Sequence, residues 1–142
     1  MLPAAGSDGD PTTAGATGGG ATLEVYNTAG SGEVASYDLP AARWRTLSET
    51  ALKAYSYTER VPGVVLTKIY VRPDKIYIRS SGALPYTLDE PMQGQVAVRI
   101  TRGTGVTWCA EGVARSPADR YDHLDYFLSG EQDAPSVCPP LP

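Results

Sequence analysis

The fourteen residues LTKIYVRPDKIYIR, from Leu66 to Arg79, alternate between apolar and polar side chains on both sides of a Pro73-Asp74 dipeptide. Such period-two alternation is typical of a strand with one buried face. Proline presets the first turn angle and aspartate is a common turn former, so the dipeptide predicts the reversal of a β-hairpin. We expect the aliphatic side chains of this hairpin to share its buried face: Ile69, Val71, Ile76 and Ile78.

The opposite face of the predicted hairpin is the best candidate for a binding site. Its six side chains are aromatic or basic: Lys68, Tyr70, Arg72, Lys75, Tyr77 and Arg79. Neighbouring strands could extend this surface with Lys53, Tyr55, Tyr57 and Arg99. Aromatic rings stack on sugars or bases, and guanidinium groups hold carboxylates or phosphates in bidentate fashion. The same residue types also suit an ordinary solvent-facing sheet, and a second sheet could cover this face.

The remaining pattern predicts a mainly β fold, an antiparallel β-sandwich or small barrel with one short C-terminal helix. Strands parted by Gly and Pro turns are expected at spacings of about ten residues. We place them at residues 23–26, 34–39, about 52–58, 84–88, 95–101 and 106–110, beside the central hairpin. Within 95–101 we expect one set of side chains to face inward, Val96, Val98 and Ile100, and the other to face outward, Gln95, Ala97, Arg99 and Thr101.

The hydrophobic period changes after residue 115. Ser116 can cap a helix that has Pro117 at its first position. Tyr121, Leu124 and Leu128 then fall at helical spacing, with Phe127 beside them, and predict a buried stripe. Gly130 would end this helix.

Residues 1–21 are rich in Gly, Ala and Thr and predict a disordered tether. The remaining residues, 22–142, suffice for a single β module with one core. The first residues lack the charged start and the apolar run of a signal peptide, so an exported form would require that Met1 belong to a trimmed or partial chain. We expect no membrane span, because no segment is long and apolar enough.

The two cysteines, Cys109 and Cys138, are too far apart for a C-x-x-C motif, and the lone His123 cannot complete a four-ligand zinc set with them. An even count with long spacing fits one structural disulfide. The alternative is a pair of unpaired thiols in a reducing cytosol. The high Gly, Pro and Thr content favours an oxidising compartment.

One cluster of ionisable residues could carry chemistry: Asp119, Asp122, His123 and Asp125. On a helix, Asp119 and His123 would share a face and could hold a divalent cation, but a solvated acidic face explains the same residues. No Gly-x-Ser-x-Gly elbow or phosphate loop is present. On a strand, the adjacent carboxylates Asp89 and Glu90 would point to opposite faces and could not share a substrate, and we expect the pair to belong to a turn over residues 88–91. We therefore expect a non-catalytic protein without a cofactor or metal, and keep a hydrolase or metal-dependent enzyme centred on His123 as the second hypothesis.

Charge and aromatic content bear on the partner. The chain has a formal net charge of −4, yet residues 43–102 hold ten basic and five acidic residues. This basic middle could attract polyanions, although it is common in ordinary domains and the whole chain is acidic, so we expect no nucleic-acid partner. Trp44, between Arg43 and Arg45, could be a stacking platform; covering a sheet edge is the more usual role.

Three segments, ALPYTLDEP (83–91), QVAVRI (95–100) and VTWCA (106–110), resemble a β-rich module of exported proteins of Gram-negative bacteria. The Tyr55-x-Tyr57 strand and the Lys75-Ile76 strand are similar to it as well, so the resemblance covers roughly residues 52–138. It implies export and a disulfide between Cys109 and Cys138. It implies no activity and no catalytic residues.

The leading functional hypothesis is a structural or attachment module that binds acidic polysaccharide through the polar face of the central hairpin. We expect it to be secreted, or located at the cell surface or in the periplasm. Another cell-surface protein is the alternative partner. A third hypothesis is a subunit of a surface assembly, held by strand pairing between chains at an exposed sheet edge.

Overall fold

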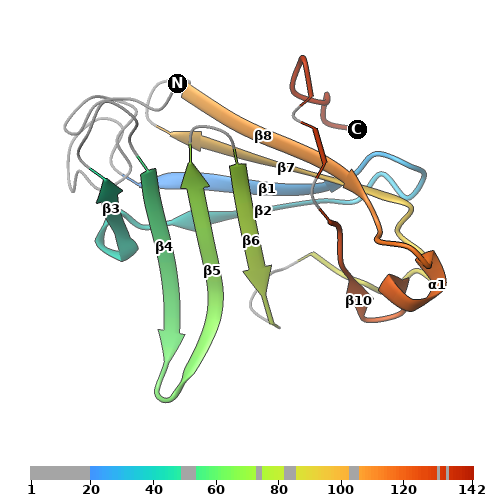
Figure 1. Cartoon of the computed structure of the whole chain (residues 1–142), viewed down its shortest axis with the longest axis horizontal. Helices are drawn as coiled ribbons and strands as arrows, with labels where there is room; N and C mark the ends of the chain where they lie inside the picture. The colour runs from blue at the N-terminus through green and yellow to red at the C-terminus, as the bar shows by residue number, and fades with distance from the viewer. Residues whose placement is uncertain are drawn as a thin grey trace. The chain divides into compact units, whose positions relative to one another are not determined.

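The computed structural model describes residues 20–48, 54–72, 75–81, 86–102, 106–130, 132–133 and 135–142 (Figure 1). The first four-stranded sheet has the order β2-β1-β7-β8 and consists of β1 (Ala21–Asn27), β2 (Val34–Leu39), β7 (Gln95–Arg102) and β8 (Val106–Val113). The second has the order β3-β4-β5-β6 and consists of β3 (Trp44–Ser48), β4 (Ala54–Val61), β5 (Val64–Arg72) and β6 (Lys75–Ser80). Two four-stranded antiparallel sheets are the components of a sandwich, and the predicted fold class is confirmed.

Three small elements complete the described part of the chain. The 3-10 turn η1 (Ala41–Arg43) precedes β3, and the helix α1 (Ala118–Tyr121) follows β8. The strands β9 (Asp122–His123) and β10 (Tyr126–Phe127) form a two-stranded antiparallel sheet.

The chain forms two compact units. The first comprises the segment up to Leu23 together with Tyr37–Leu84 and Ile100–Thr107, and the second comprises Glu24–Ser36, Pro85–Arg99 and Trp108–Pro142. That residues 22–142 make a single module stays a prediction. The predicted tether lies almost wholly outside the described residues, and β1 begins at its last residue, Ala21.

The core of the first unit lies along the inner face of the second sheet. Register places Tyr57 opposite Ile69 and Tyr55 opposite Val71, and all four side chains are fully buried. The next strand pair sets Ile69 opposite Ile78 and Val71 opposite Ile76. Ile76 and Ile78 are half-buried because β6 is an edge strand. The predicted aliphatic face of the central hairpin is thus confirmed, while its Pro73-Asp74 turn lies outside the described residues.

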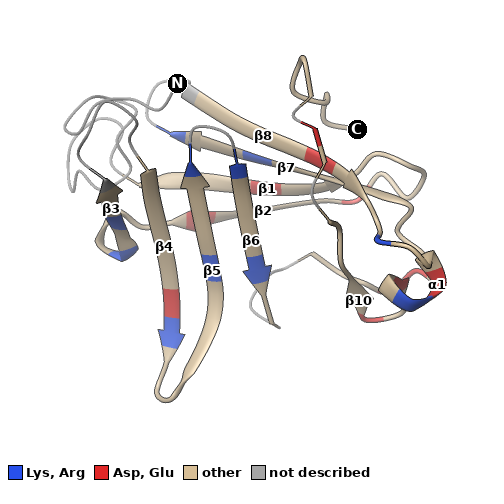
Figure 2. Ribbon diagram, in the orientation of Figure 1, with Lys and Arg blue, Asp and Glu red and all other residues tan. Residues whose placement is uncertain are grey.

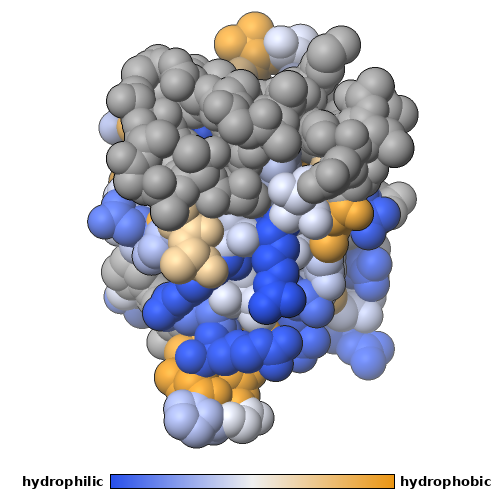
Figure 3. Space-filling view, turned by 90° about the vertical axis from the view of Figure 1, so that its left-hand side faces the viewer, coloured by the Kyte–Doolittle hydropathy of each residue, from blue (hydrophilic) through white to orange (hydrophobic). Residues whose placement is uncertain are grey.

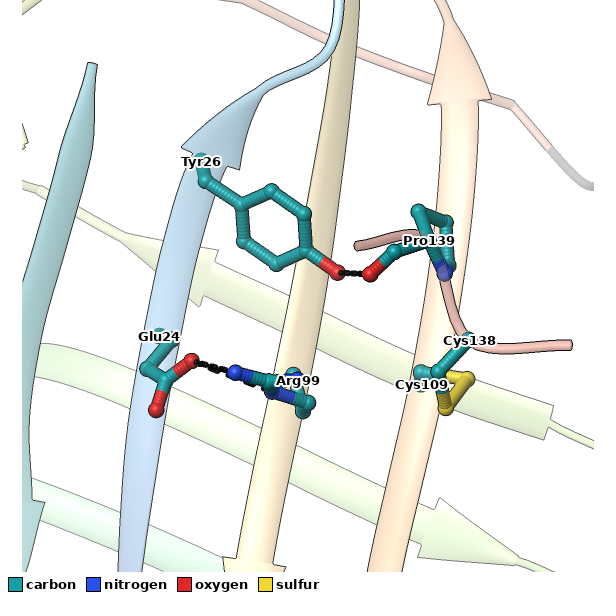
Figure 4. Close-up of a disulfide and its surroundings, with 6 residues drawn as sticks. All are labelled: Glu24, Tyr26, Arg99, Cys109, Cys138 and Pro139. Carbon is teal, nitrogen blue, oxygen red and sulfur yellow. Dashed lines mark hydrogen bonds and ion pairs between the residues drawn. A yellow bond between two sulfur atoms is a disulfide. The ribbon is translucent and has the colours of Figure 1, made fainter. Parts of the chain in front are cut away.

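A disulfide and a long-range hydrogen bond hold the second unit together (Figure 4). Cys109 on β8 is bonded to Cys138 in the C-terminal segment, with an S–S distance of 2.08 Å and a Cα–Cα distance of 5.6 Å. The hydroxyl of Tyr26 on β1 donates to the Pro139 carbonyl at 2.6 Å, beside this bond. The predicted pairing of the cysteines is confirmed.

The predicted C-terminal helix is wrong beyond its first turn. α1 ends at Tyr121, and Asp125 has a left-handed φ of 65°, which a right-handed helix excludes. The chain turns back instead, so that His123 faces Tyr126 across the β9–β10 pair. Leu124 therefore points outward and is 56% exposed. Ser116 does not cap α1, because Pro117 is its N-cap residue and no side-chain cap bond forms.

Two strand predictions also need correction. In β7, Ala97 is buried with Ile100, whereas Val96 and Val98 are only half-buried. β7 is an inner strand between β1 and β8. Two of its buried residues, Ala97 and Ile100, are three positions apart, so burial along this strand does not follow a strict alternation of period two. The expected strand over 84–88 is absent at the described residues 86–88, where the backbone is irregular.

Candidate binding surface on the β5–β6 hairpin

The register of β5 and β6 brings the six predicted site residues onto one face, named here the outer hairpin face. Lys68 lies opposite Arg79, Tyr70 opposite Tyr77, and Arg72 opposite Lys75. Directly opposed residues of an antiparallel pair project to the same side of the sheet. The face therefore consists of one row of tyrosines between two rows of basic residues. This is the arrangement expected from the alternation in the sequence.

The tyrosine row makes close ring and cation contacts. The ring centroids of Tyr70 and Tyr77 lie 5.9 Å apart with a tilt of 48°. The Nζ atom of Lys68 is 5.1 Å from the Tyr70 ring centroid, and the guanidinium carbon of Arg72 is 6.0 Å from it. Cations at such distances are attracted by the ring quadrupole, so the three side chains order one another.

An open hollow of about 740 Å³ lies over this face. All six residues of the outer hairpin face line it, together with Val64, Val65, Leu66 and Ser81. Its floor thus offers flat rings, fixed positive charge and, at one end, aliphatic side chains. Such a surface suits an extended ligand that combines apolar faces with negative charge.

The second sheet is strongly basic (Figure 2). Its four strands carry a single acidic residue, Glu59, whose carboxylate pairs with the Arg43 guanidinium at 2.9 Å. They carry six basic residues: Arg45, Arg60, Lys68, Arg72, Lys75 and Arg79. Figure 3, which is coloured by hydropathy, shows hydrophilic residues across the middle of one side of the molecule. The sheet presents an excess of positive charge on a chain that is acidic overall.

The predicted extension of this surface is wrong where the structure describes it. Tyr55 and Tyr57 are 0% exposed, because register places them on the inner face opposite Val71 and Ile69. Arg99 belongs to β7 and forms an ion pair with Glu24 at 2.6 Å (Figure 4). Lys53 lies outside the described residues.

Arg45 is the residue that sequence reasoning missed. It is exposed and lies opposite Ser56, which in turn lies opposite Tyr70, so it extends the tyrosine row across the sheet. Its neighbour Trp44 points the other way, is buried, and donates its indole N–H to the Leu39 carbonyl at 3.2 Å. The Trp44 ring packs 5.3 Å from that of Tyr57, where burial raises the pKa of the Tyr57 hydroxyl. Trp44 is therefore a core residue and not a stacking platform.

The structure does not gather the proposed catalytic cluster into a metal site. Asp122 is buried, and its carboxylate accepts backbone N–H groups of Gln93 at 2.6 Å and Gly94 at 2.8 Å. His123 is exposed and stacks on Tyr126 with ring centroids 5.3 Å apart. Because α1 ends at Tyr121, the shared helical face expected for Asp119 and His123 is not formed.

A different set of carboxylates comes together in the second unit. The described residues include one group whose oxygens lie within 4.8 Å of one another: Glu33, Asp89 and Glu90. Asp89 and Glu90 lie in an irregular segment with a bend at residues 90 and 91, as expected for a turn, so no strand alternation separates their side chains. The Thr87 hydroxyl oxygen lies 2.9 Å from carboxylate oxygens of both Glu33 and Asp89 and shares its one proton between them. The Gln93 side-chain amide donates to Glu90 at 2.8 Å. Oxygen sets of this kind suit divalent cations, and here protein donors already occupy part of the set.

Among the helices in the described part of the chain, none has the length and apolar character of a membrane span. Comparison with protein-family models, with curated proteins and with solved structures finds no match to this chain. The resemblance to the β-rich module of exported bacterial proteins therefore stays a prediction. Function has to be inferred from the outer hairpin face itself.

Proposed function

We propose that this chain is a non-catalytic extracellular attachment module that binds acidic polysaccharide through the outer hairpin face. One observation carries the proposal: the Tyr70–Tyr77 pair lies between two cationic rows that line the same open hollow. Rings offer stacking surface to the apolar faces of sugars, and the flanking Lys and Arg side chains offer charge-assisted hydrogen bonds to carboxylates.

The spacing of the rows favours a polymer over a small anion. The Lys68–Arg79 row and the Arg72–Lys75 row are four residues apart along the strands, which corresponds to roughly 14 Å at a rise of ~3.4 Å per residue. One carboxylate cannot contact both rows. A chain of charged sugars can span them while a ring in the middle stacks on the tyrosines, so affinity should rise steeply with oligomer length.

The disulfide supports the extracellular part of the proposal. Cys109 and Cys138 are bonded, and structural disulfides persist mainly in oxidising compartments. Acidic polysaccharides are found in the same extracellular setting as such a module.

The first experiment measures binding to polygalacturonate, with neutral dextran as the comparison polymer, by titration calorimetry. Tyr70→Ala and Tyr77→Ala should each weaken polygalacturonate binding by about tenfold, since one lost stacking contact costs ~1–3 kcal/mol. Tyr126→Ala is the matched control, because Tyr126 and Tyr77 are both 43% exposed. Equal loss with Tyr126→Ala, or equal binding of dextran by the natural chain, would contradict the proposal.

The second experiment tests the cationic rows. The double variant Lys68→Gln/Arg79→Gln should lower the affinity and also flatten its dependence on salt, because fewer counterions are then exchanged. Arg45→Gln should have a smaller effect in the same direction, since Arg45 lies at the far end of the tyrosine row. Arg120→Gln removes a charge on α1, in the other unit, and should leave binding unchanged.

A further inference from the structure

The β4–β5 hairpin extends past both of its neighbours in the second sheet (Figure 1). β3 pairs with β4 only over Ala54–Tyr57, and β6 pairs with β5 only over Thr67–Arg72. Residues 58–66, named here the β4–β5 tip, therefore form a two-stranded ribbon that no other strand of the described residues flanks. A backbone bond from the Ser81 N–H to the Leu66 carbonyl at 2.9 Å reaches its base.

The end of this tip is apolar. Val61 lies opposite Val64 around a Pro62-Gly63 turn in which Gly63 has a φ of +81°. Val61, Val64 and Val65 are 44%, 53% and 38% exposed. A hydrophobic patch accordingly lies at the lower end of the surface in Figure 3, below the hydrophilic middle. Turns in solvent favour polar residues, so three adjacent exposed aliphatic side chains indicate a surface that a partner covers.

Positive charge surrounds the base of the tip. Arg60 lies directly opposite Val65, and the Lys68–Arg79 pair follows along the same hairpin. The acidic residue nearby, Glu59, is paired with Arg43. The order along the ribbon is thus aliphatic at the end and cationic behind it, with no unpaired carboxylate among the described residues between them.

We propose that the β4–β5 tip inserts into the surface of an anionic lipid bilayer. The valines would enter the boundary between headgroups and acyl chains, to a depth of about 5–10 Å, which is the depth that interfacial segments reach. Arg60 then lies at the level of the phosphates. Lys68 and Arg79 lie farther from the bilayer surface, within about one to two Debye lengths of it, where the negative surface potential is weaker but still attracts them. The proposal goes beyond polysaccharide binding and uses residues that the tyrosine variants leave intact.

The test is co-sedimentation with vesicles of phosphatidylcholine alone or with phosphatidylserine at a molar ratio of about 70:30. The chain should partition onto the mixed vesicles and not onto the neutral ones. Val61→Ser/Val64→Ser should lower partitioning by about tenfold or more, because the apolar area that enters the bilayer is lost. Arg60→Gln should lower it several-fold and weaken its salt dependence. Tyr70→Ala/Tyr77→Ala should leave it unchanged.

The matched control is Val113→Ser/Val137→Ser, which removes two exposed valines of the other unit. It should partition like the natural chain. Val64→Trp measures insertion of the tip directly. An indole that enters the bilayer emits at shorter wavelength and is quenched by brominated lipids.

Three outcomes would overturn the proposal. They are equal partitioning of the two double-valine variants, an indole at position 64 that stays in water, and absence of binding to the mixed vesicles. A dimer in dilute solution that dissociates in Val61→Ser/Val64→Ser would assign the tip to a second copy of the chain, and would also overturn it. Failure of vesicle binding with intact polygalacturonate binding would leave the outer hairpin face as the functional site, so the two proposals fail separately.

Discussion

Replacement of Asp122 by alanine tests how the second unit is held together, and separates a structural from a catalytic role for this residue. Asp122 is 2% exposed, and its carboxylate accepts two backbone N–H groups, from Gln93 at 2.6 Å and Gly94 at 2.8 Å. Gln93 is itself buried, and its carbonyl accepts the Asn27 amide at 2.6 Å. Asp122 therefore anchors the irregular segment before β7 to the β9 strand.

The magnitude follows from the two donors that alanine would leave without a partner. A buried backbone donor without an acceptor costs ~1–3 kcal/mol. The Gln93 N–H is buried and should bear this cost in full, whereas the Gly94 N–H lies in an exposed residue and can turn to water. We expect Asp122→Ala to lower the free energy of unfolding by about 1–3 kcal/mol. Asp122→Asn keeps one acceptor and should lie between alanine and the natural chain.

The assay is urea denaturation with the disulfide intact, and unfolding is monitored by the fluorescence of Trp44 and Trp108. Asp119→Ala and His123→Ala are the controls, since both residues are exposed. Each should change the free energy of unfolding by less than about 0.5 kcal/mol.

A loss of under about 1 kcal/mol in Asp122→Ala would refute the anchoring role. Equal losses in all three variants, together with sensitivity to a chelator, would instead support the hypothesis of a metal-dependent enzyme centred on His123.

Two further predictions concern pH and the disulfide. Burial raises the pKa of Tyr86 from 10.0 to about 12, so the folded chain holds this proton more tightly than the unfolded chain does. The resulting stability is complete below pH 10 and is lost between pH 10 and about 12; urea midpoints of Tyr86→Phe should therefore fall less steeply over this range than those of the natural chain. The bond between Cys109 and Cys138 closes a loop with a sequence separation of 29, so Cys109→Ala/Cys138→Ala should cost about 3–4 kcal/mol in the chain-entropy account. Equal urea midpoints of the natural chain and this double variant would refute it.

The structure of the central hairpin could be predicted from residues 66–79, because it depends on the pattern of neighbouring residues alone. In a hairpin, the pleat alternates side chains between two faces, and the turn fixes which residues oppose each other. Both strands carry the same alternation, so the face with Tyr70 and Tyr77 follows without knowledge of the rest of the fold. The pairing of Cys109 with Cys138 could also be predicted, for a different reason: only two cysteines are present.

The limits of the binding surface depended on the neighbouring strand. Tyr55 and Tyr57 look like a continuation of the aromatic pattern, but a register shift of one residue moves every side chain of a strand to the other face. The observed register sets Tyr57 against Ile69 and buries it, while it sets Ser56 and Arg45 in line with Tyr70. Strand order and register arise from long-range pairing, which the local pattern of β4 does not contain.

The segment after β8 shows most clearly the difference between what the local pattern predicts and what long-range contacts decide. The spacing of Tyr121, Leu124 and Leu128 suits a helix, yet long-range bonds compete with the helical ones. The Asp125 N–H donates to the Leu88 carbonyl at 2.8 Å, and the Asp122 carboxylate binds the Gln93 backbone at 2.6 Å. These partners lie far away in the sequence. The periodicity around residue 122 therefore determined only the propensity for a helical turn. The fold of the whole chain selected the β9–β10 turn that replaces the rest of the helix.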